Sequence, residues 1–198
     1  HTTSLTRPPM IAAEKVLNIP SLILLKNREV ISTKRLSASQ FFSVLSLQNV
    51  KQRTRMIVEY MCAEKMNYAV CGTTNKTELL TGFFVKYGDG GVDLEPIANC
   101  YKSQVYKLAE LLHIDQRIIS RAPSPDTWSH FTSDEEISLR IPYDILDQLL
   151  YADENHLPRE IVQQSTKLDM ERIEWANKHI LSLKNAARVL QLSPPVYV

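Results

Sequence analysis

The clearest candidate for a ligand site in the sequence is the stretch from Asn67 to Gln104. All five glycines of the chain fall within it, at positions 72, 82, 88, 90 and 91. Glycine lets a backbone approach a ligand closely. Around the glycines lie one hydroxyl, three carboxylates and two lysines, which are Thr73, Glu78, Asp89, Asp93, Lys86 and Lys102. Charges of both signs beside a glycine-rich turn are suited to binding a polyanion together with a cation.

The segment from Gly72 to Glu78 resembles a strand end followed by a helix start. Gly72 ends an apolar run, and Thr73 opens the helical pattern that follows. In parallel sheets, ligands bind beyond the carboxyl ends of the strands, where backbone amides of the next helix point. Glu78 lies one turn into that helix, where a carboxylate is placed to hold Mg²⁺. We therefore expect a ligand site here.

Each of these residues also has an ordinary structural explanation. Glycines gather in tight turns, and the helix dipole favours an acidic residue such as Glu78 in the first turn. Asp89 is a typical turn residue, and Lys102 is typical of an exposed lysine. A solvated surface explains any one of them but explains the whole set less readily, so we favour the ligand site.

Strand-like and helical patterns alternate along the chain. Apolar runs at residues 21–25 and 68–72 predict buried strands, and the polar residues 26–40 predict a loop. Apolar residues at three- and four-residue steps predict a helix over residues 41–66. Further helical patterns occupy residues 74–84, 95–114, 134–151 and 158–192. Strands followed by glycine turns and helices predict an α/β fold with a parallel sheet.

The composition narrows the class of protein. A chain of 198 residues and 22.7 kDa is expected to form one domain over its whole length. Its net charge of +1 gives no general attraction to nucleic acid or membranes, and no apolar run is long enough to span a bilayer. Cys62, Cys71 and Cys100 have no metal-like spacing and are expected to be buried, reduced thiols, which predicts a cytoplasmic location.

Several motifs resemble one family. The residues "GTTNKTELLTGFFVKYGDGGVDLEPIANCYKSQVYKLAELL", at positions 72–112, resemble the signature region of the ammonia-dependent NAD synthetases, members of the N-type ATP pyrophosphatase group. Upstream lies "NVKQRTRM" at 49–56, and downstream lie "APSPDTW" at 122–128 and "TSDEEISLRIPYDILDQLL" at 132–150. The resemblance implies a doubly wound parallel sheet, flavodoxin-like and adenine nucleotide alpha hydrolase-like, with a helical C-terminal extension.

The resemblance also implies a reaction. ATP adenylates the nicotinate carboxylate of deamido-NAD and releases pyrophosphate, and ammonia then attacks the acyl adenylate to give NAD and AMP. Such a ligase works by positioning its substrates and by neutralising charge with Mg²⁺ and cationic side chains. The absence of a Ser–His or Cys–His arrangement in the sequence agrees with this mechanism. The sequence leaves the source of ammonia open: it could arrive free, or an external glutaminase partner could supply it.

Ten residues match family positions with implied roles. Thr73, Lys102 and Ser124 would contact ATP, and Glu78 would bind Mg²⁺. Asp89 would lie close to the reacting centre. Contacts with deamido-NAD are implied for Asn49, Arg53, Lys86, Asp93 and Lys184.

Two of these positions carry additional implications. The family counterpart of Arg53 works with a second subunit, which implies a homodimer whose contact face is formed by the helices around residues 41–66. The family has a His-Lys pair near its C-terminal end, but here Leu183 stands where the histidine would precede Lys184. The substrate role of Lys184 therefore matches only half of its motif.

One family motif has no counterpart. The family carries a Ser-Gly-Gly-x-Asp-Ser phosphate loop after its first strand, whereas no glycine precedes Gly72 here. Either the chain is incomplete at its N-terminus, or the natural protein lacks the loop. We favour the first, because a parallel sheet without its central strand would expose an apolar edge. A related amide ligase for another carboxylate, and a non-catalytic homologue, remain the alternative functions.

Overall fold

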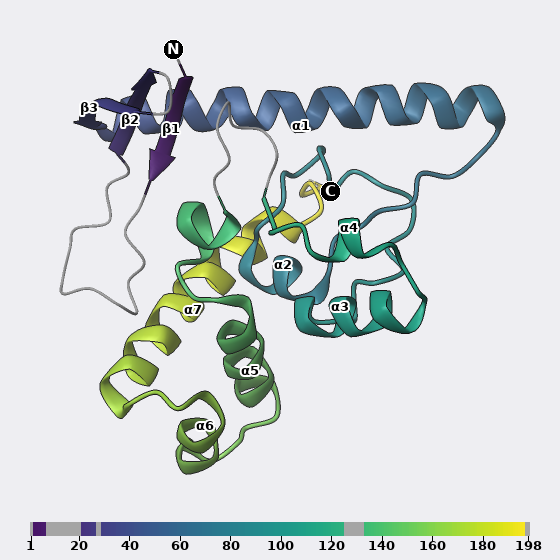
Figure 1. Cartoon of the computed structure of the whole chain (residues 1–198). Helices are drawn as coiled ribbons and strands as arrows, with labels where there is room; N and C mark the ends of the chain where they lie inside the picture. The colour runs from purple at the N-terminus through teal and green to yellow at the C-terminus, as the bar shows by residue number, and fades with distance from the viewer. Residues whose placement is uncertain (1, 7–20, 27–28, 125–132, 197–198) are drawn as a thin grey trace.

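The computed structural model describes residues 2–6, 21–26, 29–124 and 133–196. In chain order these ranges form strands and helices that are labelled in Figure 1. They are β1 (Thr2–Thr6), β2 (Ser21–Lys26), β3 (Glu29–Arg35), α1 (Ala38–Met66), α2 (Lys76–Thr81), α3 (Lys102–Leu111), α4 (Gln116–Ile119), a π-helical turn η1 (Glu135–Leu139), α5 (Tyr143–Glu154), α6 (Arg159–Thr166) and α7 (Met170–Gln191).

A long helix, α1, runs along one side of the body formed by α2 to α7, and the strands lie near its N-terminal end (Figure 1). It confirms the helix predicted over residues 41–66, but it begins three residues earlier, at Ala38. Ser37 explains the earlier start, since its Oγ accepts the N–H of Gln40, while the Gln40 side chain accepts the N–H of Ser37 at 3.1 Å. This capping box satisfies two backbone groups at the start of the helix.

The three strands form an antiparallel sheet in the order β1-β2-β3. The predicted strand at 21–25 is present, but its expected parallel pairing is wrong. The predicted loop over 26–40 is also wrong, because β3 occupies Glu29–Arg35. Only two residues separate β2 from β3, and such a short connection joins strands antiparallel. Ile31 and Thr33 are β-branched residues, which are favoured in strands.

The segment at residues 68–72 does not form the buried strand that its sequence predicts. It makes one isolated parallel bridge, between Cys71 and Leu94. The N–H of Gly72 donates to the Leu94 carbonyl at 2.7 Å, and the N–H of Asp93 donates to the Val70 carbonyl at 3.0 Å. Among the described residues this segment is paired on one side only. A buried parallel strand needs neighbours on both sides, and this explains why the strand is reduced to a bridge.

The hydrophobic core lies in the C-terminal helical part and supports the rest of the molecule. It is centred on side chains of η1, α5 and α7 that have almost no exposed surface, including Leu139, Leu146, Leu149, Leu150 and Ile173. The helical patterns predicted over 134–151 and 158–192 are therefore confirmed as η1, α5, α6 and α7. Because α5 is packed into this core, the polar side chains that it carries, such as Tyr143 and Asp147, are held in fixed positions.

Two smaller expectations concern the cysteines and the helices. Cys62 and Cys71 are exposed and Cys100 is half-buried, so the expected burial of all three thiols is wrong. Cys62 lies on α1, whose surface is largely uncovered, and Cys71 lies in the segment that is paired on one side only. Within the described part of the chain, no helix has the length and apolar character needed to cross a bilayer.

Candidate functional site

A cavity of about 1030 Å³ opens between α1, the start of α2, the glycine turn (residues 82–91), α3 and the segment after α4. Eight of the ten residues singled out from the sequence line it, namely Asn49, Arg53, Thr73, Glu78, Lys86, Asp89, Lys102 and Ser124. Its volume lies at the upper end of the range for small-molecule sites. Residues from separate elements thus converge on one concave surface.

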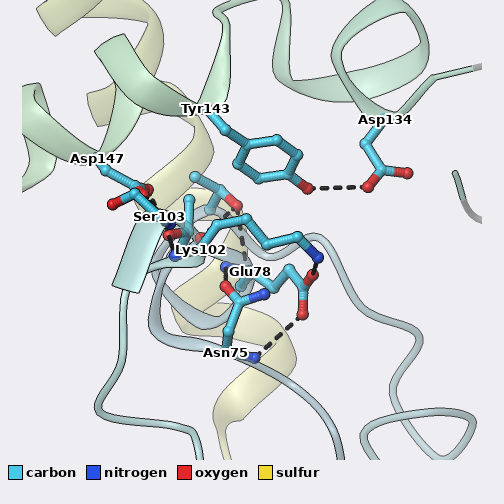
Figure 2. Close-up of polar contacts among 9 residues, drawn as sticks. Asn75, Glu78, Lys102, Ser103, Asp134, Tyr143 and Asp147 are labelled. Atoms are coloured by element: carbon cyan, nitrogen blue, oxygen red, sulfur yellow. Dashed lines mark hydrogen bonds and ion pairs between the residues drawn. The ribbon is translucent and has the colours of Figure 1, made fainter. Parts of the chain in front are cut away.

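The start of α2 presents Glu78 to this cavity. Asn75 is the residue that caps the helix, with its Oδ1 accepting the N–H of Glu78 at 3.0 Å. The Glu78 carboxylate returns the bond, since its Oε2 accepts the N–H of Asn75 at 3.1 Å. Its other oxygen, Oε1, lies 3.4 Å from the Nζ of Lys102 (Figure 2). The cap therefore holds the carboxylate at the helix start and directs one oxygen to a lysine.

Lys102 is the first residue of α3 and is not an ordinary exposed lysine. Its side chain retains 20% of its surface, and its ammonium lies 5.5 Å from the centre of the Tyr143 ring. The backbone N–H of Lys102 donates to the Thr77 hydroxyl at 3.0 Å. That hydroxyl in turn donates to Asp147 on α5 at 2.6 Å. Side chains from α2 and α5 therefore hold the start of α3, and with it the charge of Lys102.

A buried carboxyl group, Asp134, faces the same cavity. Asp134 is 4% exposed, and its Oδ2 accepts the hydroxyl of Tyr143 at 2.9 Å (Figure 2). Among the described residues its Oδ1 has no hydrogen-bond partner. Burial raises the pKa of Asp134 to about 6, against the opposing effects of Tyr143 and the Lys102 charge. Burial also raises the pKa of Tyr143 far above its usual value, which keeps the phenol protonated as the donor.

The glycine turn is closed by Asp89. Its Oδ1 accepts the N–H of Val85 at 2.8 Å, and burial raises the pKa of this carboxyl group. The turn is attached to α1, because the Nε of Arg53 donates to the Lys86 carbonyl at 3.2 Å. An added Cβ at Gly90 would lie 2.8 Å from the ring of Phe84. Close packing within the protein thus accounts for this glycine, as the tight-turn explanation proposed.

Two of the ten residues lie outside the large cavity. Asp93 accepts the Tyr60 hydroxyl at 3.0 Å and the Val70 N–H at 2.7 Å, and it lines a second cavity of about 450 Å³. Lys86 lines both cavities. Lys184 lines neither, and its Nζ lies 2.6 Å from the Oδ2 of Asp153. Asp93 therefore lies in a cavity next to the large one, and Lys184 lies outside both.

Comparison with known proteins identifies the family. The family model described as NAD synthase matches residues 12–185. The chain belongs to the NAD synthase family. A similar curated protein is the NH(3)-dependent NAD(+) synthetase of Rhizobium rhizogenes, 42% identical over 160 residues, which are 81% of this chain and 48% of that protein. The NH(3)-dependent NAD(+) synthetase of Rhizobium meliloti is 39% identical over 89% of this chain and 53% of its own length. The chain spans about half the length of these relatives.

Solved structures show the same fold. The NH3-dependent NAD synthetase of Campylobacter jejuni is 26% identical, with a TM-score of 0.56 over 78% of this chain and 56% of that chain. The NMN synthetase of Francisella tularensis is 25% identical, with a TM-score of 0.62 over 80% of this chain and 61% of that chain. The predicted family and fold class are therefore confirmed, while the strands of the described residues differ as reported above.

Four residues that line the large cavity or support its wall were not singled out from the sequence, namely Thr77, Asp134, Tyr143 and Asp147. The motif at 132–150 was matched without assigning roles to its residues. A signal was nevertheless present, because Tyr143 and Asp147 are four residues apart and thus share one helix face. Asp147 also lies three residues before Leu150, so it occupies the apolar face of the helix, which indicates a buried carboxylate.

Proposed function

We propose that the protein is an ammonia-dependent NAD synthetase, a ligase that amidates deamido-NAD through an acyl adenylate. The observation that carries the proposal is the convergence of eight implied residues on one cavity, although they come from separate elements. The names of the curated relatives support it. The products would be NAD, AMP and pyrophosphate.

ATP is proposed to bind where α2 and α3 begin. The ammonium of Lys102 would neutralise phosphate charge, and Thr73 and Ser124 line the same cavity. Mg²⁺ is held in proteins by one or two carboxylates together with substrate phosphates. Glu78 fits this pattern, because its carboxylate lines the cavity. The described residues contain no group of three or more metal-binding side chains, so the phosphates would complete the coordination. The ion would supply charge neutralisation at the phosphates.

Deamido-NAD is proposed to lie along the glycine turn. Asn49 and Arg53 border the large cavity from α1, and Asp89 borders it from the turn. Lys86 lines both this cavity and the second one, where Asp93 lies, and two adjacent cavities suit an extended dinucleotide. The geometry offers no support for a substrate contact by Lys184, whose ammonium is paired with Asp153.

A homodimer formed through α1 is part of the proposal. Of the 29 residues of this helix, only Ala63 is buried. Large apolar side chains are exposed along it, including Phe42, Leu47, Ile57, Val58 and Met61. Large apolar side chains exposed in this number on one helix are typical of a protein interface. Arg53 and Asn49 lie on the same helix, so a second copy would approach the substrate site.

A second candidate function is amidation of a mononucleotide. The similarity to the NMN synthetase of Francisella tularensis favours it. The two candidates differ in the carboxylate that is amidated, and parallel assays with deamido-NAD and nicotinate mononucleotide separate them. Higher kcat/KM for deamido-NAD is expected, and higher kcat/KM for the mononucleotide would replace the first proposal by the second.

The test of the proposed function measures NAD and pyrophosphate formed by the complete protein from deamido-NAD, ATP, Mg²⁺ and ammonia. Glu78→Gln is expected to preserve the fold, because an amide can still accept the Asn75 N–H, and to abolish Mg²⁺-dependent pyrophosphate release. The control is Glu110→Gln on the exposed part of α3. A wild-type protein that releases no pyrophosphate would be a non-catalytic homologue. Full activity of Glu78→Gln would contradict the metal role.

A further inference from the structure

The start of α3 is capped by side chains from two other helices. The first N–H groups of a helix have no partner within it. The N–H of Lys102 donates to the Thr77 hydroxyl of α2 at 3.0 Å, and the N–H of Ser103 donates to the Oδ2 of Asp147 on α5 at 2.7 Å. Figure 2 shows Asp147 beside Ser103 and Lys102. Three helices thus meet at two backbone N–H groups.

Asp147 is the centre of this arrangement. It is 4% exposed, and both of its oxygens are used, since Oδ1 accepts the Thr77 hydroxyl at 2.6 Å and Oδ2 accepts the Ser103 N–H. Ionised carboxylates are costly to bury unless they are hydrogen-bonded, and the N-terminal end of a helix dipole favours a negative charge. Its neighbour Leu146 and Leu150, one turn on, are fully buried in the core. Asp147 is therefore a fixed point to which α2 and α3 are attached.

The attachment points lie beside the proposed ATP and Mg²⁺ residues. Thr77 immediately precedes Glu78 in α2, and Ser103 immediately follows Lys102 in α3. Glu78 and Lys102 approach each other at 3.4 Å at the cavity wall. Their separation therefore depends on the relative position of two helix starts, and one buried carboxylate sets that position.

We propose that Asp147 is a positioning residue, which acts through Thr77 and Ser103 to hold Glu78 and Lys102 in the arrangement that receives the phosphates of ATP. Asp147 does not line either cavity, so it acts on the ligand only through these neighbours. This inference rests on the proposed function. A misplacement of about 1 Å at a reacting group can cost on the order of a hundredfold in rate. A residue that contributes only stability has no such effect.

The first experiment compares two buried threonines. Thr77→Val keeps the shape of the side chain but removes the acceptor of the Lys102 N–H and the donor to Asp147. Thr166→Val is the matched control on α6, because its buried hydroxyl also donates one hydrogen bond, here to the Val162 carbonyl at 2.7 Å, and accepts one N–H, that of Leu168 at 3.4 Å. Stability of each variant is measured by urea unfolding, so that kinetics are compared among folded proteins.

We expect Thr77→Val to lower kcat for NAD formation roughly tenfold or more, with KM for deamido-NAD changed less than about threefold. Thr77→Ser retains the hydroxyl and is expected to restore kcat. Thr166→Val is expected to lose stability with kcat unchanged. Equal kcat losses in Thr77→Val and Thr166→Val would overturn the proposal, because the effect would then follow stability alone.

A second experiment uses ATP binding and does not depend on turnover. Calorimetry with ATP and Mg²⁺ is applied to the wild type, Asp147→Asn, Lys102→Met and the double variant. If Asp147 acts through Lys102, the loss of ATP affinity caused by Asp147→Asn is at least severalfold smaller in the Lys102→Met variant than in the wild type. Additive losses would overturn the positioning role, even if Thr77→Val proves too unstable to assay.

The two experiments also separate this inference from the proposed function. A wild type that binds ATP and shows a coupled cycle, but makes no NAD from deamido-NAD, would retain the positioning role and lose the proposed reaction. A wild type that makes NAD and shows an additive cycle would retain the reaction and lose the positioning role. A wild type that does not bind ATP would overturn both.

Discussion

The carboxyl group of Asp134 leads to a prediction about pH at the scale of a single residue. Its pKa in the folded protein is about 6, raised by burial, whereas an unfolded aspartate ionises near 4. Between these values the folded state binds more protons, so this group lowers stability as the pH rises through the window. We compare the free energy of unfolding of Asp134→Asn with that of the wild type. We expect this difference to favour the variant by about 1–2 kcal/mol more at pH 7.5 than at pH 4.5.

Urea unfolding at the two pH values, without nucleotide or Mg²⁺, measures this difference. Asp144→Asn provides the control, because Asp144 lies exposed on the first turn of α5. Comparing the two pH values cancels any effect of the amide that does not depend on pH. An Asp134→Asn gain that is the same at pH 4.5 and 7.5 would contradict the raised pKa.

Asp93 carries a prediction about substrate specificity. Asp93→Asn is expected to raise KM for deamido-NAD about tenfold, the effect of losing one charge-assisted hydrogen bond, and to change KM for ATP much less. In the wild type, Asp93 accepts both the Tyr60 hydroxyl and the Val70 N–H. The asparagine amide retains one oxygen, which can still accept one of these two hydrogen bonds. Steady-state kinetics with each substrate varied separately provide the measurement.

Tyr60→Phe is the control for Asp93, because it removes the hydrogen bond between α1 and Asp93 and leaves the carboxylate in place. If both KM values rise equally in Asp93→Asn, the assignment of Asp93 to the dinucleotide is wrong. If Tyr60→Phe reproduces the effect, Asp93 acts by holding α1 against the segment that contains Val70.

At the scale of elements, Gly82 joins α2 to α7. It ends α2 with φ of +70°, and an added Cβ would lie 2.9 Å from the Cα of Ala187. Gly82→Ala therefore combines the cost of the left-handed conformation with a clash against the backbone of α7. We expect the free energy of unfolding to fall by about 2–4 kcal/mol. Urea unfolding followed by circular dichroism measures the loss.

Asn67→Ala separates the two contributions to the Gly82 prediction. Asn67 ends α1 with φ of 55° and is exposed, so its replacement tests the left-handed conformation without the clash. Its expected loss is about 1 kcal/mol. A Gly82→Ala loss no greater than that of Asn67→Ala would show that α7 yields to the added methyl group.

At the scale of the whole molecule, the open surface of α1 predicts self-association. Ile57 on α1 is 62% exposed, and Ile57→Lys would place a charge within the proposed dimer face. We expect the wild type to sediment as a dimer and Ile57→Lys to sediment as a monomer. Loss of the dimer is also expected to reduce NAD formation, since Arg53 lies on the same helix.

Val189→Lys is the matched control for the dimer, because Val189 is 66% exposed but belongs to a different helix, α7. Sedimentation velocity at several protein concentrations distinguishes the states. A wild type that stays monomeric at micromolar concentrations would contradict the dimer. A monomeric Val189→Lys would move the interface from α1 to α7.

Local sequence patterns were sufficient to predict most of the helices, and the family resemblance supplied the main candidate residues. Apolar spacing predicted α1, α5 and α7. A helix makes its hydrogen bonds within one short segment, so local residues are sufficient to predict it. The family resemblance then named ten residues, of which eight line the large cavity.

The strand pairing and the buried carboxylates could not be predicted from local patterns, because they depend on contacts between distant segments. A strand depends on the neighbour with which it pairs, so β2 became antiparallel, β3 was missed, and residues 68–72 formed a single bridge. Thr77 and Asp147 meet although they are 70 positions apart. Asp134 owes its raised pKa to burial. Contacts between distant segments create these properties, and local sequence patterns carry no record of which segments will meet.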